Sequence, residues 1–486
     1  MKLAWLGKRG IALGALLVAI IRFLLKRRRR MSKTYDCIPY AGWWYLLQLV
    51  FDGKNANRRL YEYYKHKGIV KVKGITLGDE IVLFNLEDVK YCHKHEGIGP
   101  GGAGDTLFTR LTQYFSEPKP QNGLGPHSHG RNMFGRGVGH NKTRKLAMSS
   151  KMKSSPSVLT SAIRVVDLVE RYDDFMEWVQ FSQIDMFFSV MTGISPDLTN
   201  PEAEHPLKRL PEDEEKAFVS GLLLSVLPKC FTRTMEAEFV DAMDNMTGLG
   251  VQELDTTFLS LSDDERPESF MKSLLRTGTE QDARELMALF ITAFQGNIAL
   301  TFQNLIFHVA NNPTVQDKLY EEIVRACETG DHMQAQMPYL AAIFSESHRL
   351  TPITDFTQVR VYEHDITLPS GWELPAGSKV MMLNKLSTRD KDLVCNAGKF
   401  IPERFLHKEP DENLSHFLQR SEFGSSSRSC LGRRTAKVML KAVVIELFKR
   451  YHLEAFPHCT TFSIDPVDPS FNRIKNFPKI NLRPRT

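Results

Sequence analysis

One long helical segment restricts the folds that this chain of 486 residues can adopt. From Thr279 to Asn312 the sequence holds helix-forming residues, with Gly296 as its one glycine, and Pro313 ends the pattern. At ~1.5 Å per residue the helix would be roughly 50 Å long, which is enough to cross a whole domain. We expect a capping box of Thr277 and Glu280 near its start.

The middle of this segment is apolar enough to leave two alternatives. Residues 286–310 carry no charge if His308 is neutral, so the stretch fits either a membrane span or a helix that protein buries on every side. Polar side chains are costly in lipid, and the run contains Gln295, Asn297, Gln303, Asn304 and His308. A buried helix in a large protein is therefore the preferred interpretation.

The remaining pattern predicts a mainly α protein with a minor β part. Residues 68–85 and 365–383 are each expected to form a small β-hairpin. Residues 142–230 are mainly helical, and a polar, proline-containing stretch at 200–216 is expected to be a surface loop within them. Apolar residues return at helical spacing in residues 438–451, which predicts another helix.

Composition and charge exclude two classes of protein. The chain is 42% apolar and 25% charged, which is ordinary globular composition and excludes a largely disordered protein. The net charge is +6, but part of this surplus lies in KRRRR at residues 26–30. The rest of the chain is close to neutral, which argues against nucleic acid as a partner. Seven scattered cysteines without paired spacing indicate reduced thiols inside a cell.

Residues 1–35 are expected to lie outside the folded body, which we place at residues 36–486. Residues 11–21 are apolar, with three basic residues before them and six after them up to Lys33. This distribution favours a signal anchor that holds the body on the cytoplasmic face of the endoplasmic reticulum membrane. The segment is also rich in arginine and free of acids, as a mitochondrial transit peptide would be. Both alternatives stay open, and the anchor is preferred.

A cysteine inside a serine-rich loop carries the clearest chemical signal. Residues 423–432 read FGSSSRSCLG, and the predicted helix follows soon after. The unpaired N–H groups and the positive dipole end of a helix favour a thiolate at Cys430. Gly432 allows a flat group to approach closely, and Arg428 is near enough to pair with an anion. Such a thiol suits either an axial ligand of haem iron or a nucleophile.

Two further segments supply a carboxylate and two guanidinium groups. Glu346 and Arg349 are three residues apart, so they meet on one face of a helix. Arg404, in FIPERF at residues 400–405, would complete a Glu-Arg-Arg network. Taken singly, each of these pairs is most often a solvated surface ion pair.

In this order and spacing, Glu346-x-x-Arg349, PERF at residues 402–405 and the loop around Cys430 resemble the cytochrome P-450 superfamily. The resemblance covers residue 36 to the C-terminus, and KHEG at residues 94–97 and CLGRR from Cys430 onward are more similar to its mitochondrial subgroup. It implies the triangular, mainly helical haem-thiolate fold with small β-sheets, a monomeric catalytic domain at residues 36–486, and bound haem b.

The resemblance also implies roles for single residues. Cys430 would be the axial ligand of the haem iron, and Glu346, Arg349 and Arg404 would form the structural network behind the haem. Asn141 stands where the family has the tryptophan of a Trp-x-x-x-Arg helix, so the indole donor is missing. The implied cofactor-binding residues are Arg428 and Arg360 at the haem propionates, Lys145 in place of the arginine of that helix, Phe423 and Gly432.

The long helix departs from the family pattern at the oxygen-binding position. Counted back from Pro313, the usual Ala-Gly-x-acid-Thr falls on residues 293–297, so Gly296 stands at the acid and Asn297 at the alcohol. An asparagine can hydrogen-bond oxygen or water, but it does not readily donate a proton at neutral pH. Thr301 follows on the same helix face and would hold a relay water. Alternatively, this polar stripe makes buried hydrogen bonds to neighbouring helices.

Three functions remain open at this point. We expect a haem-thiolate monooxygenase that inserts one oxygen atom of O₂ into a small apolar substrate, such as a sterol, a lipid or a xenobiotic. Its catalytic residues would be Asn297, Thr301 and Gly296, and NADPH would supply electrons through a reductase or a ferredoxin. The alternatives are an electron-independent isomerase or lyase for a lipid peroxide, because QGN at 295–297 is also similar to prostacyclin synthases, and a non-catalytic haem-binding protein.

The sequence leaves the electron donor open. The mitochondrial subgroup meets its ferredoxin through lysines on the helix that carries the Glu-x-x-Arg motif. Ala341 and Ser345 stand at those positions in this chain. A ferredoxin and a membrane-bound reductase are therefore both retained as candidate partners.

Overall fold

The structure is a computed structural model that describes most of the chain. The described residues are 33–73, 79–95, 107–125, 129, 143, 146, 156–226, 233–328, 330, 333, 335–354, 359–406, 422–424, 429–459, 462 and 472–485. The predicted N-terminal segment, residues 1–35, lies almost wholly outside them.

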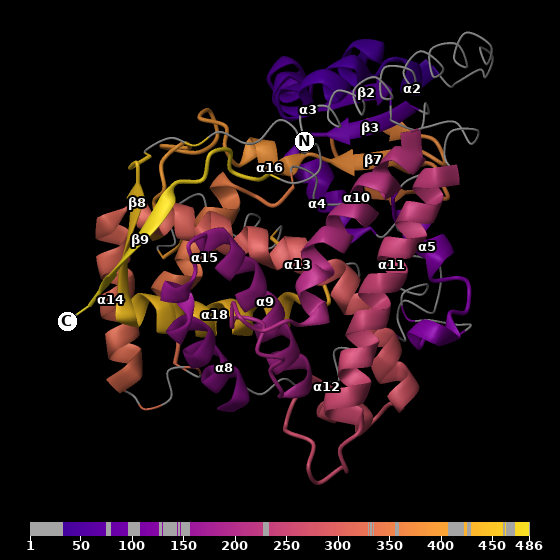
Figure 1. The fold of residues 1–486 in the computed structure, drawn as a ribbon. Coiled ribbons are helices and arrows are strands. Elements are labelled where there is room, and N and C mark those ends of the chain that lie inside the picture. The colour runs from indigo at the N-terminus through magenta and orange to yellow at the C-terminus, as the bar shows by residue number, and fades with distance from the viewer. Residues whose placement is uncertain are drawn as a thin grey trace.

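Helices build most of the described fold, and the prediction of a mainly α protein with a minor β part is confirmed (Figure 1). The α-helices are α2 (Lys33–Asp36), α3 (Gly42–Tyr64), α4 (Leu86–Lys94), α5 (Leu107–Tyr114), α8 (Pro156–Asp167), α9 (Phe175–Thr192), α10 (Leu210–Val226), α11 (Arg233–Leu254), α12 (Phe270–Leu275), α13 (Glu280–Ala310), α14 (Pro313–Glu328), α15 (Pro338–Leu350), α16 (Asn384–Ser387) and α18 (Arg433–Arg450). Shorter helical turns are η1 (Lys65–Lys67), η3 (Pro120–Asn122), η4 (Val169–Arg171), η5 (Pro206–Arg209), η7 (Asp255–Leu259) and η8 (Pro402–Phe405).

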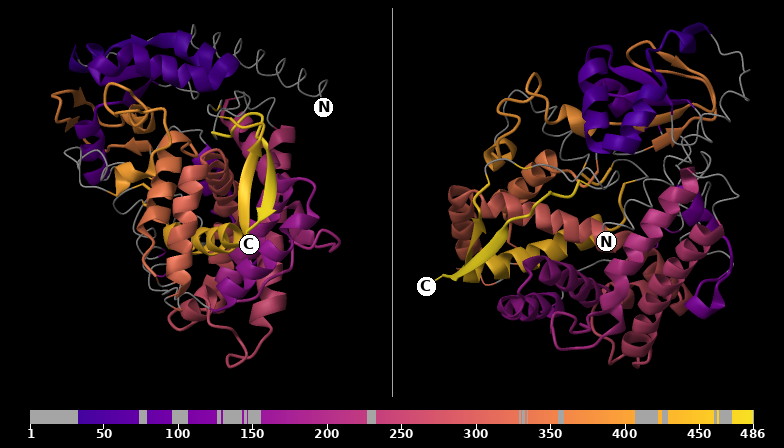
Figure 2. Two further views of the ribbon diagram at one scale, coloured as in Figure 1. Left: turned by 90° about the vertical axis from the view of Figure 1, so that its left-hand side faces the viewer. Right: turned by 45° about the horizontal axis from the view of Figure 1, so that its top comes forward.

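The strands form small, separate sheets. They are β1 (Tyr40–Ala41), β2 (Ile69–Lys73), β3 (Asp79–Leu83), β4 (Val359–Val361), β5 (Ile366–Thr367), β6 (Glu373–Leu374), β7 (Lys379–Met382), β8 (Tyr451–Phe456) and β9 (Lys479–Pro484). Among the described residues, β1, β2, β3, β7 and β4 lie side by side in that order, while β5 pairs with β6 and β8 with β9. The larger sheet and α3 pack together at one end of the molecule (Figure 2).

The two predicted hairpins differ in outcome. In the first, β2 and β3 are antiparallel with Ile69 opposite Leu83, as predicted. In the second, β5 and β6 form a short hairpin, but β7 leaves it and pairs in parallel with β3. The reason is burial, because Val380 and Met382 of β7 are fully buried and Met381 packs on the opposite side of the sheet. A strand that is apolar on both faces belongs in the middle of a sheet.

The long helix α13 passes through the centre of the helical part (Figure 1). It packs against α9, α10, α11, α14 and α15, and Leu286, Met287 and Ile306 are completely buried. The predicted burial is therefore present in much of the helix, but Ala293 is exposed and Gly296 and Asn297 are only half-buried. Across the described ranges, no unbroken helix has the length and apolarity of a membrane span; only the two halves of α13 taken together reach them, across a bend of 41°.

The start of α13 lies two residues later than the predicted capping box of Thr277 and Glu280. Thr279 Oγ1 accepts the N–H of Asp282, and the Asp282 carboxylate accepts the N–H of Thr279 at 2.8 Å. Thr277 is unavailable as a cap because its own N–H continues the last turn of α12 by donating to the carbonyl of Leu274. The predicted three-residue spacing between the cap and the acid was right, but the predicted position of the capping box was wrong.

The prediction of a surface loop at residues 200–216 is wrong in its second half. The helix α10 begins at Leu210, with Pro211 in its first turn followed by Glu212 and Asp213. Proline fits the first helical turn because its missing N–H has no partner there, and acids are stabilised by the positive end of the helix dipole. The composition of these residues is typical of a loop, but a proline followed by two acids is also typical of the first turn of a helix.

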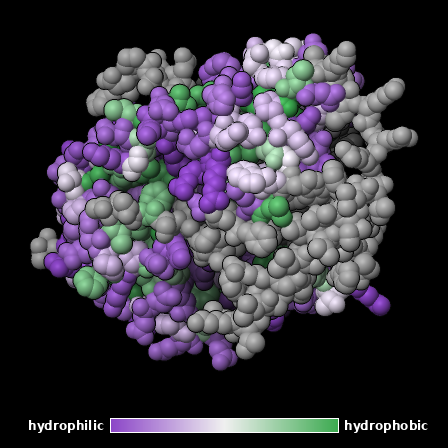
Figure 3. Space-filling model, turned by 90° about the horizontal axis from the view of Figure 1, so that it is seen from above, coloured by the Kyte–Doolittle hydropathy of each residue, from purple (hydrophilic) through white to green (hydrophobic). Residues whose placement is uncertain are grey.

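The surface over the α3 end of the molecule is mixed in character. Figure 3 looks down on this end, and its coloured residues are mostly hydrophilic with separate hydrophobic ones among them. Tyr40, Trp44 and Leu47 are large hydrophobic residues that remain exposed here. Single exposed apolar residues of this kind are normal on protein surfaces.

We predict that Thr279→Ala lowers the free energy of unfolding by about 1 kcal/mol, because it removes the side-chain cap of α13. Thr277→Ala is the matched control, since the Thr277 hydroxyl makes only a 3.4 Å contact with the carbonyl of Leu274. Urea unfolding of both variants measures the difference. An equal loss in the two variants would contradict the observed position of the cap.

Candidate active site

The helix α13 bends at the residues that the sequence singled out. Its halves Glu280–Phe294 and Gly296–Ala310 meet at 41°. Asn297 Nδ2 donates to the carbonyl oxygen of Ala293 at 2.8 Å, and Thr301 Oγ1 donates to the carbonyl oxygen of Asn297 at 2.7 Å. Asn297 and Thr301 therefore lie one turn apart on one helix face, directly after the bend.

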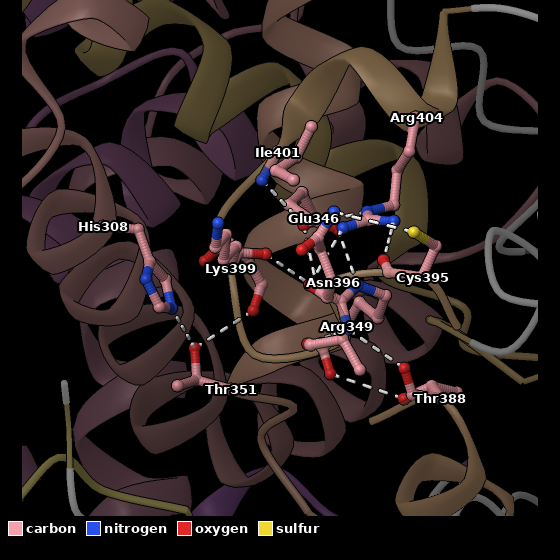
Figure 4. Close-up of polar contacts among 12 residues, drawn as sticks. His308, Glu346, Arg349, Thr351, Thr388, Cys395, Asn396, Lys399, Ile401 and Arg404 are labelled. Atoms are coloured by element: carbon pink, nitrogen blue, oxygen red, sulfur yellow. Dashed lines mark hydrogen bonds and ion pairs between the residues drawn. The ribbon is translucent and has the colours of Figure 1, made fainter. Parts of the chain in front are cut away.

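The second half of the polar stripe has a structural role. Asn304 Nδ2 donates to the carbonyl of Thr351, and the His308 ring lies 3.0 Å from the Thr351 hydroxyl (Figure 4). Burial, with a smaller contribution from the nearby charge of Arg349, lowers the pKa of His308 to about 3, so its ring is neutral. The alternative of buried hydrogen bonds to neighbouring segments thus holds for Asn304 and His308.

Glu346 and Arg349 of α15 form an ion pair that solvent does not reach. Arg349 Nε lies 2.7 Å from one carboxylate oxygen and Nη2 lies 2.9 Å from the other, and both side chains are 0% exposed. Arg404 of η8 adds its Nε at 3.0 Å and remains 18% exposed (Figure 4). The three residues that the sequence grouped from two segments are therefore in contact.

The remaining donors of Arg349 hold a distant part of the chain. Its Nη1 donates to the carbonyls of Thr388 and Ala397, and its Nη2 donates to that of Lys399. Glu346 also accepts the N–H of Ile401 at 2.8 Å. The buried pair thereby satisfies its own hydrogen-bonding groups while it fixes the chain between α16 and η8 against α15.

Cys430 sits at the start of α18. Its N–H donates to the carbonyl of Phe423 at 2.7 Å, which closes the loop that the sequence identified. The backbone N–H groups of Gly432 and Arg433 are directed at the Cys430 sulfur. The positively charged Arg433 also lies beside the ring of Phe423, with 5.9 Å between guanidinium and ring centre.

The thiol of Cys430 is both surrounded by protein and accessible. Burial raises its pKa, and the N–H groups of Gly432 and Arg433 together with the Arg433 charge act in the opposite direction. The residue nevertheless keeps exposed surface. The predicted donors are present, although desolvation outweighs them in the free thiol.

A comparison with models of protein families matches residues 38–470 to the family described as "Cytochrome P450". The chain belongs to the cytochrome P450 family. The predicted family, fold class and enzyme class, an oxidoreductase of the monooxygenase type, are thereby confirmed.

Similar P450s come from insects and mammals. "Cytochrome P450 12b1, mitochondrial" of Drosophila acanthoptera is 24% identical over 87% of this chain and 85% of that protein. "Cytochrome P450 CYP12A2" of Musca domestica is 30% identical over 39% of this chain and 38% of that protein. "Sterol 26-hydroxylase, mitochondrial" of Rattus norvegicus is 24% identical over 49% and 48%. The last two matches span less than two thirds of the relatives' own length.

The preference for the endoplasmic reticulum is wrong. Several relatives, including those of Drosophila acanthoptera and Rattus norvegicus, are named mitochondrial, which points to the mitochondrion. The count of basic residues around the apolar run misled this inference, because an arginine-rich segment without acids also suits a transit peptide.

The residues around Cys430 fit the haem that the P450 family holds through a cysteine thiolate. Two N–H donors point at the sulfur, and the residue keeps exposed surface. Phe423 and Gly432 flank it in the same loop. Arg360 lies on β4, where its charge, after burial, helps to lower the pKa of His93 of α4. Its role at the haem propionates stays a prediction. Arg428, Lys145 and Asn141 lie outside the described residues.

The sequence reasoning missed Glu214 of α10. Its carboxylate accepts the N–H of Gly296 at 2.9 Å, directly at the bend of α13. Two further segments lie nearby: the charge of Arg473 acts on Glu214, and Asn472 hydrogen-bonds to the carbonyls of Pro352 and Ile353. The signal available in the sequence was the helix start at residues 210–213. Recognising it would have replaced the predicted loop with a helix that carries Glu214.

Arg349→Ala should destabilise the P450 by about 3–5 kcal/mol, because it leaves the Glu346 carboxylate buried without its partner. Arg404→Ala should cost about 1–2 kcal/mol, since this arginine is partly exposed and the main pair survives. Thermal unfolding measures both, with Lys216→Ala, which breaks a surface pair, as the control without a measurable change. Equal losses for Arg349 and Arg404 would contradict the assigned order.

Proposed function

We propose that this P450 is a monooxygenase that inserts one oxygen atom of O₂ into a small apolar substrate of the sterol, lipid or xenobiotic type. NADPH would supply the electrons through a redox partner. The haem, when bound, supplies the activation of O₂. The other steps would fall to the protein: Cys430 would hold the iron, Asn297 and Thr301 would hold oxygen and water, and Glu346, Arg349 and Arg404 would fix the supporting chain.

The observation that carries this proposal is the geometry of Cys430. Cys430 is an exposed residue just before α18, and its sulfur receives the N–H groups of Gly432 and Arg433. Hydrogen bonds of this kind stabilise negative charge on a coordinating sulfur and tune the ligand. The relatives named sterol 26-hydroxylase support the sterol-like substrate class, at 24% identity for the rat protein.

Cys430→Ala should abolish the red-shifted Soret band of the reduced carbon monoxide complex, because that band requires a thiolate ligand on the haem iron. Cys395→Ala is the matched control, as Cys395 is also an exposed thiol but lies near Arg404 instead of α18. The difference spectrum of reduced, CO-treated protein is the measurement. A band that survives in the Cys430 variant would refute the ligand assignment.

Dependence on NADPH separates this function from the electron-independent alternative. A monooxygenase forms hydroxylated product only with O₂, NADPH and a redox partner. Conversion of a lipid hydroperoxide without any electron donor, in protein that shows the thiolate band, would instead favour the isomerase or lyase that the missing acid on α13 suggested.

We also propose that this P450 works in the mitochondrion, with residues 1–35 as transit segment and residues 36–486 as catalytic domain. Its electron donor would then be a small acidic ferredoxin. The lysines expected at positions 341 and 345 are absent, and Ser345 is buried against Glu422, so its side chain lies inside the protein. A donor must therefore use another positive surface.

The first turns of α18 provide that surface. Arg433, Arg434 and Lys437 are exposed and follow directly after the Cys430 loop. The charges of Arg433 and Lys437 act on the buried carboxyl of Glu422, which compensates part of the unfavourable clustering of three cations at the positive end of a helix. An acidic partner would compensate the rest. Charge complementarity of this kind steers association and raises the association rate.

Arg434→Glu should raise the KM for a [2Fe–2S] ferredoxin by about tenfold at low salt, with the thiolate band unchanged, because it reverses a charge on the docking surface. Lys449→Glu is the matched control at the far end of α18. Steady-state reduction kinetics at two ionic strengths measure the effect, which should shrink as salt increases. Equal KM changes for the two variants would rule out this surface.

A further inference from the structure

A carboxyl group from α10 reaches the bend of α13. Glu214 Oε1 accepts the backbone N–H of Gly296 at 2.9 Å. The two residues in contact belong to different helices and are 82 positions apart in the sequence. It falls where the halves of α13 meet at 41°, immediately before Asn297 and one turn before Thr301.

The glycine at position 296 makes room for this carboxyl group. A Cβ atom on Gly296 would lie 3.1 Å from Oε1 and 3.2 Å from Oε2 of Glu214. These distances are shorter than ordinary contacts, so a side chain at 296 would require the Glu214 carboxyl to shift by a few tenths of an ångström. The glycine that stands at the family's acid position on α13 is thus the residue that admits an acid from α10.

Glu214 can hold a proton near neutral pH. Burial raises its pKa to about 7, while the N–H of Gly296 and the charge of Arg473 act against this shift. The flanking acids of α10 face elsewhere, since Glu212 pairs with Lys216 on the surface and Asp213 bonds to a side chain of α11. Groups that exchange protons near the working pH are the most effective general acids.

Building on the proposed monooxygenase function, we propose that Glu214 is the proton donor of the oxygen-binding site and supplies from α10 the acid that is missing at position 296 of α13. Asn297 and Thr301 lie on α13 next to the contact and would hold the water through which the proton passes. Composition had placed Glu214 in a surface loop. The proposal instead gives it the role of proton donor at the bend of α13.

The proposed step balances. Each hydroxylation consumes one O₂, two electrons from NADPH and two protons, and it yields one hydroxylated product and one water. Glu214 contributes one proton: its O–H bond breaks, the proton moves through the held water to the oxygen atom that leaves as water, and the carboxylate regains a proton from solvent. If this supply fails, reduced oxygen leaves as hydrogen peroxide after taking two electrons and two protons.

Two other uses of Glu214 make different predictions. A carboxylate that only stabilises the bend of α13 would affect unfolding but not the fate of oxygen. A carboxylate that binds the ammonium group of a basic substrate would affect the affinity for amines. Neither use requires the carboxyl group to lose and regain a proton in each turnover.

The first experiment measures the proton directly. Infrared difference spectra of the resting holoenzyme across a pH titration should show a carboxylic acid band with a midpoint near pH 7, which Glu214→Gln removes. Glu215→Gln, an exposed neighbour on α10, is the matched control and should retain the band. A midpoint near the ordinary glutamate value of about 4.3 would overturn the proposal.

The second experiment follows the fate of oxygen with NADPH, a [2Fe–2S] ferredoxin and its reductase. Glu214→Gln should lower the rate of water formation by about 100-fold and raise the peroxide released per NADPH. In wild type, peroxide release should increase above pH 7, where Glu214 loses its proton, whereas peroxide release from the variant should not change with pH in this range. Unchanged peroxide release, with a loss confined to unfolding temperature or to the affinity for amines, would overturn the proposal.

A rescue variant tests the position of the acid. Glu214→Ala opens space beside residue 296, so Gly296→Asp in that background should restore water formation by placing an acid on α13 itself. No recovery in a variant that keeps the thiolate band would count against a donor here. If wild-type protein itself lacks that band, the proposed function fails, whereas an intact band with unaltered oxygen chemistry in Glu214→Gln refutes only this inference.

Discussion

The buried ion pair of Glu346 and Arg349 is the interaction on which the rest of the site depends. Both side chains are completely buried, so their charges are compensated only by each other, by Arg404 and by backbone groups. Through these contacts α15 holds the chain at residues 388–401, and Thr351, directly after α15, holds Asn304 and His308 of α13. The pair thus connects the helix that forms the oxygen side with the segment that leads towards Cys430.

The two chemical ends of the site are built by opposite means. At Cys430, a residue that keeps exposed surface, the protein directs backbone N–H groups at a sulfur. At the bend of α13 it buries a carboxyl group of another helix against a backbone N–H. The N–H groups at Cys430 favour negative charge on the sulfur, although burial outweighs them in the free thiol, whereas burial of Glu214 favours its neutral acid.

Local spacing in the sequence was enough for much of this. The long helix, the Glu346 and Arg349 pair and the loop around Cys430 each follow from residues within a few positions of one another. The exact cap of α13 at Thr279, the placement of β7 beside β3 and the contact of Glu214 with Gly296 could not be predicted in the same way. Each depends on packing between distant segments, and composition at residues 200–216 favoured a loop where a proline and two acids begin α10.

The contact between Glu214 and Gly296 also constrains how this protein can evolve. A side chain at 296 and a carboxyl group at 214 compete for the same space, since a Cβ atom there would lie 3.1 Å from the glutamate oxygen. A side chain at 296 therefore requires the flexible end of Glu214 to move by a few tenths of an ångström. We expect the residue at one position to influence which residues the other position tolerates in descendants of this chain.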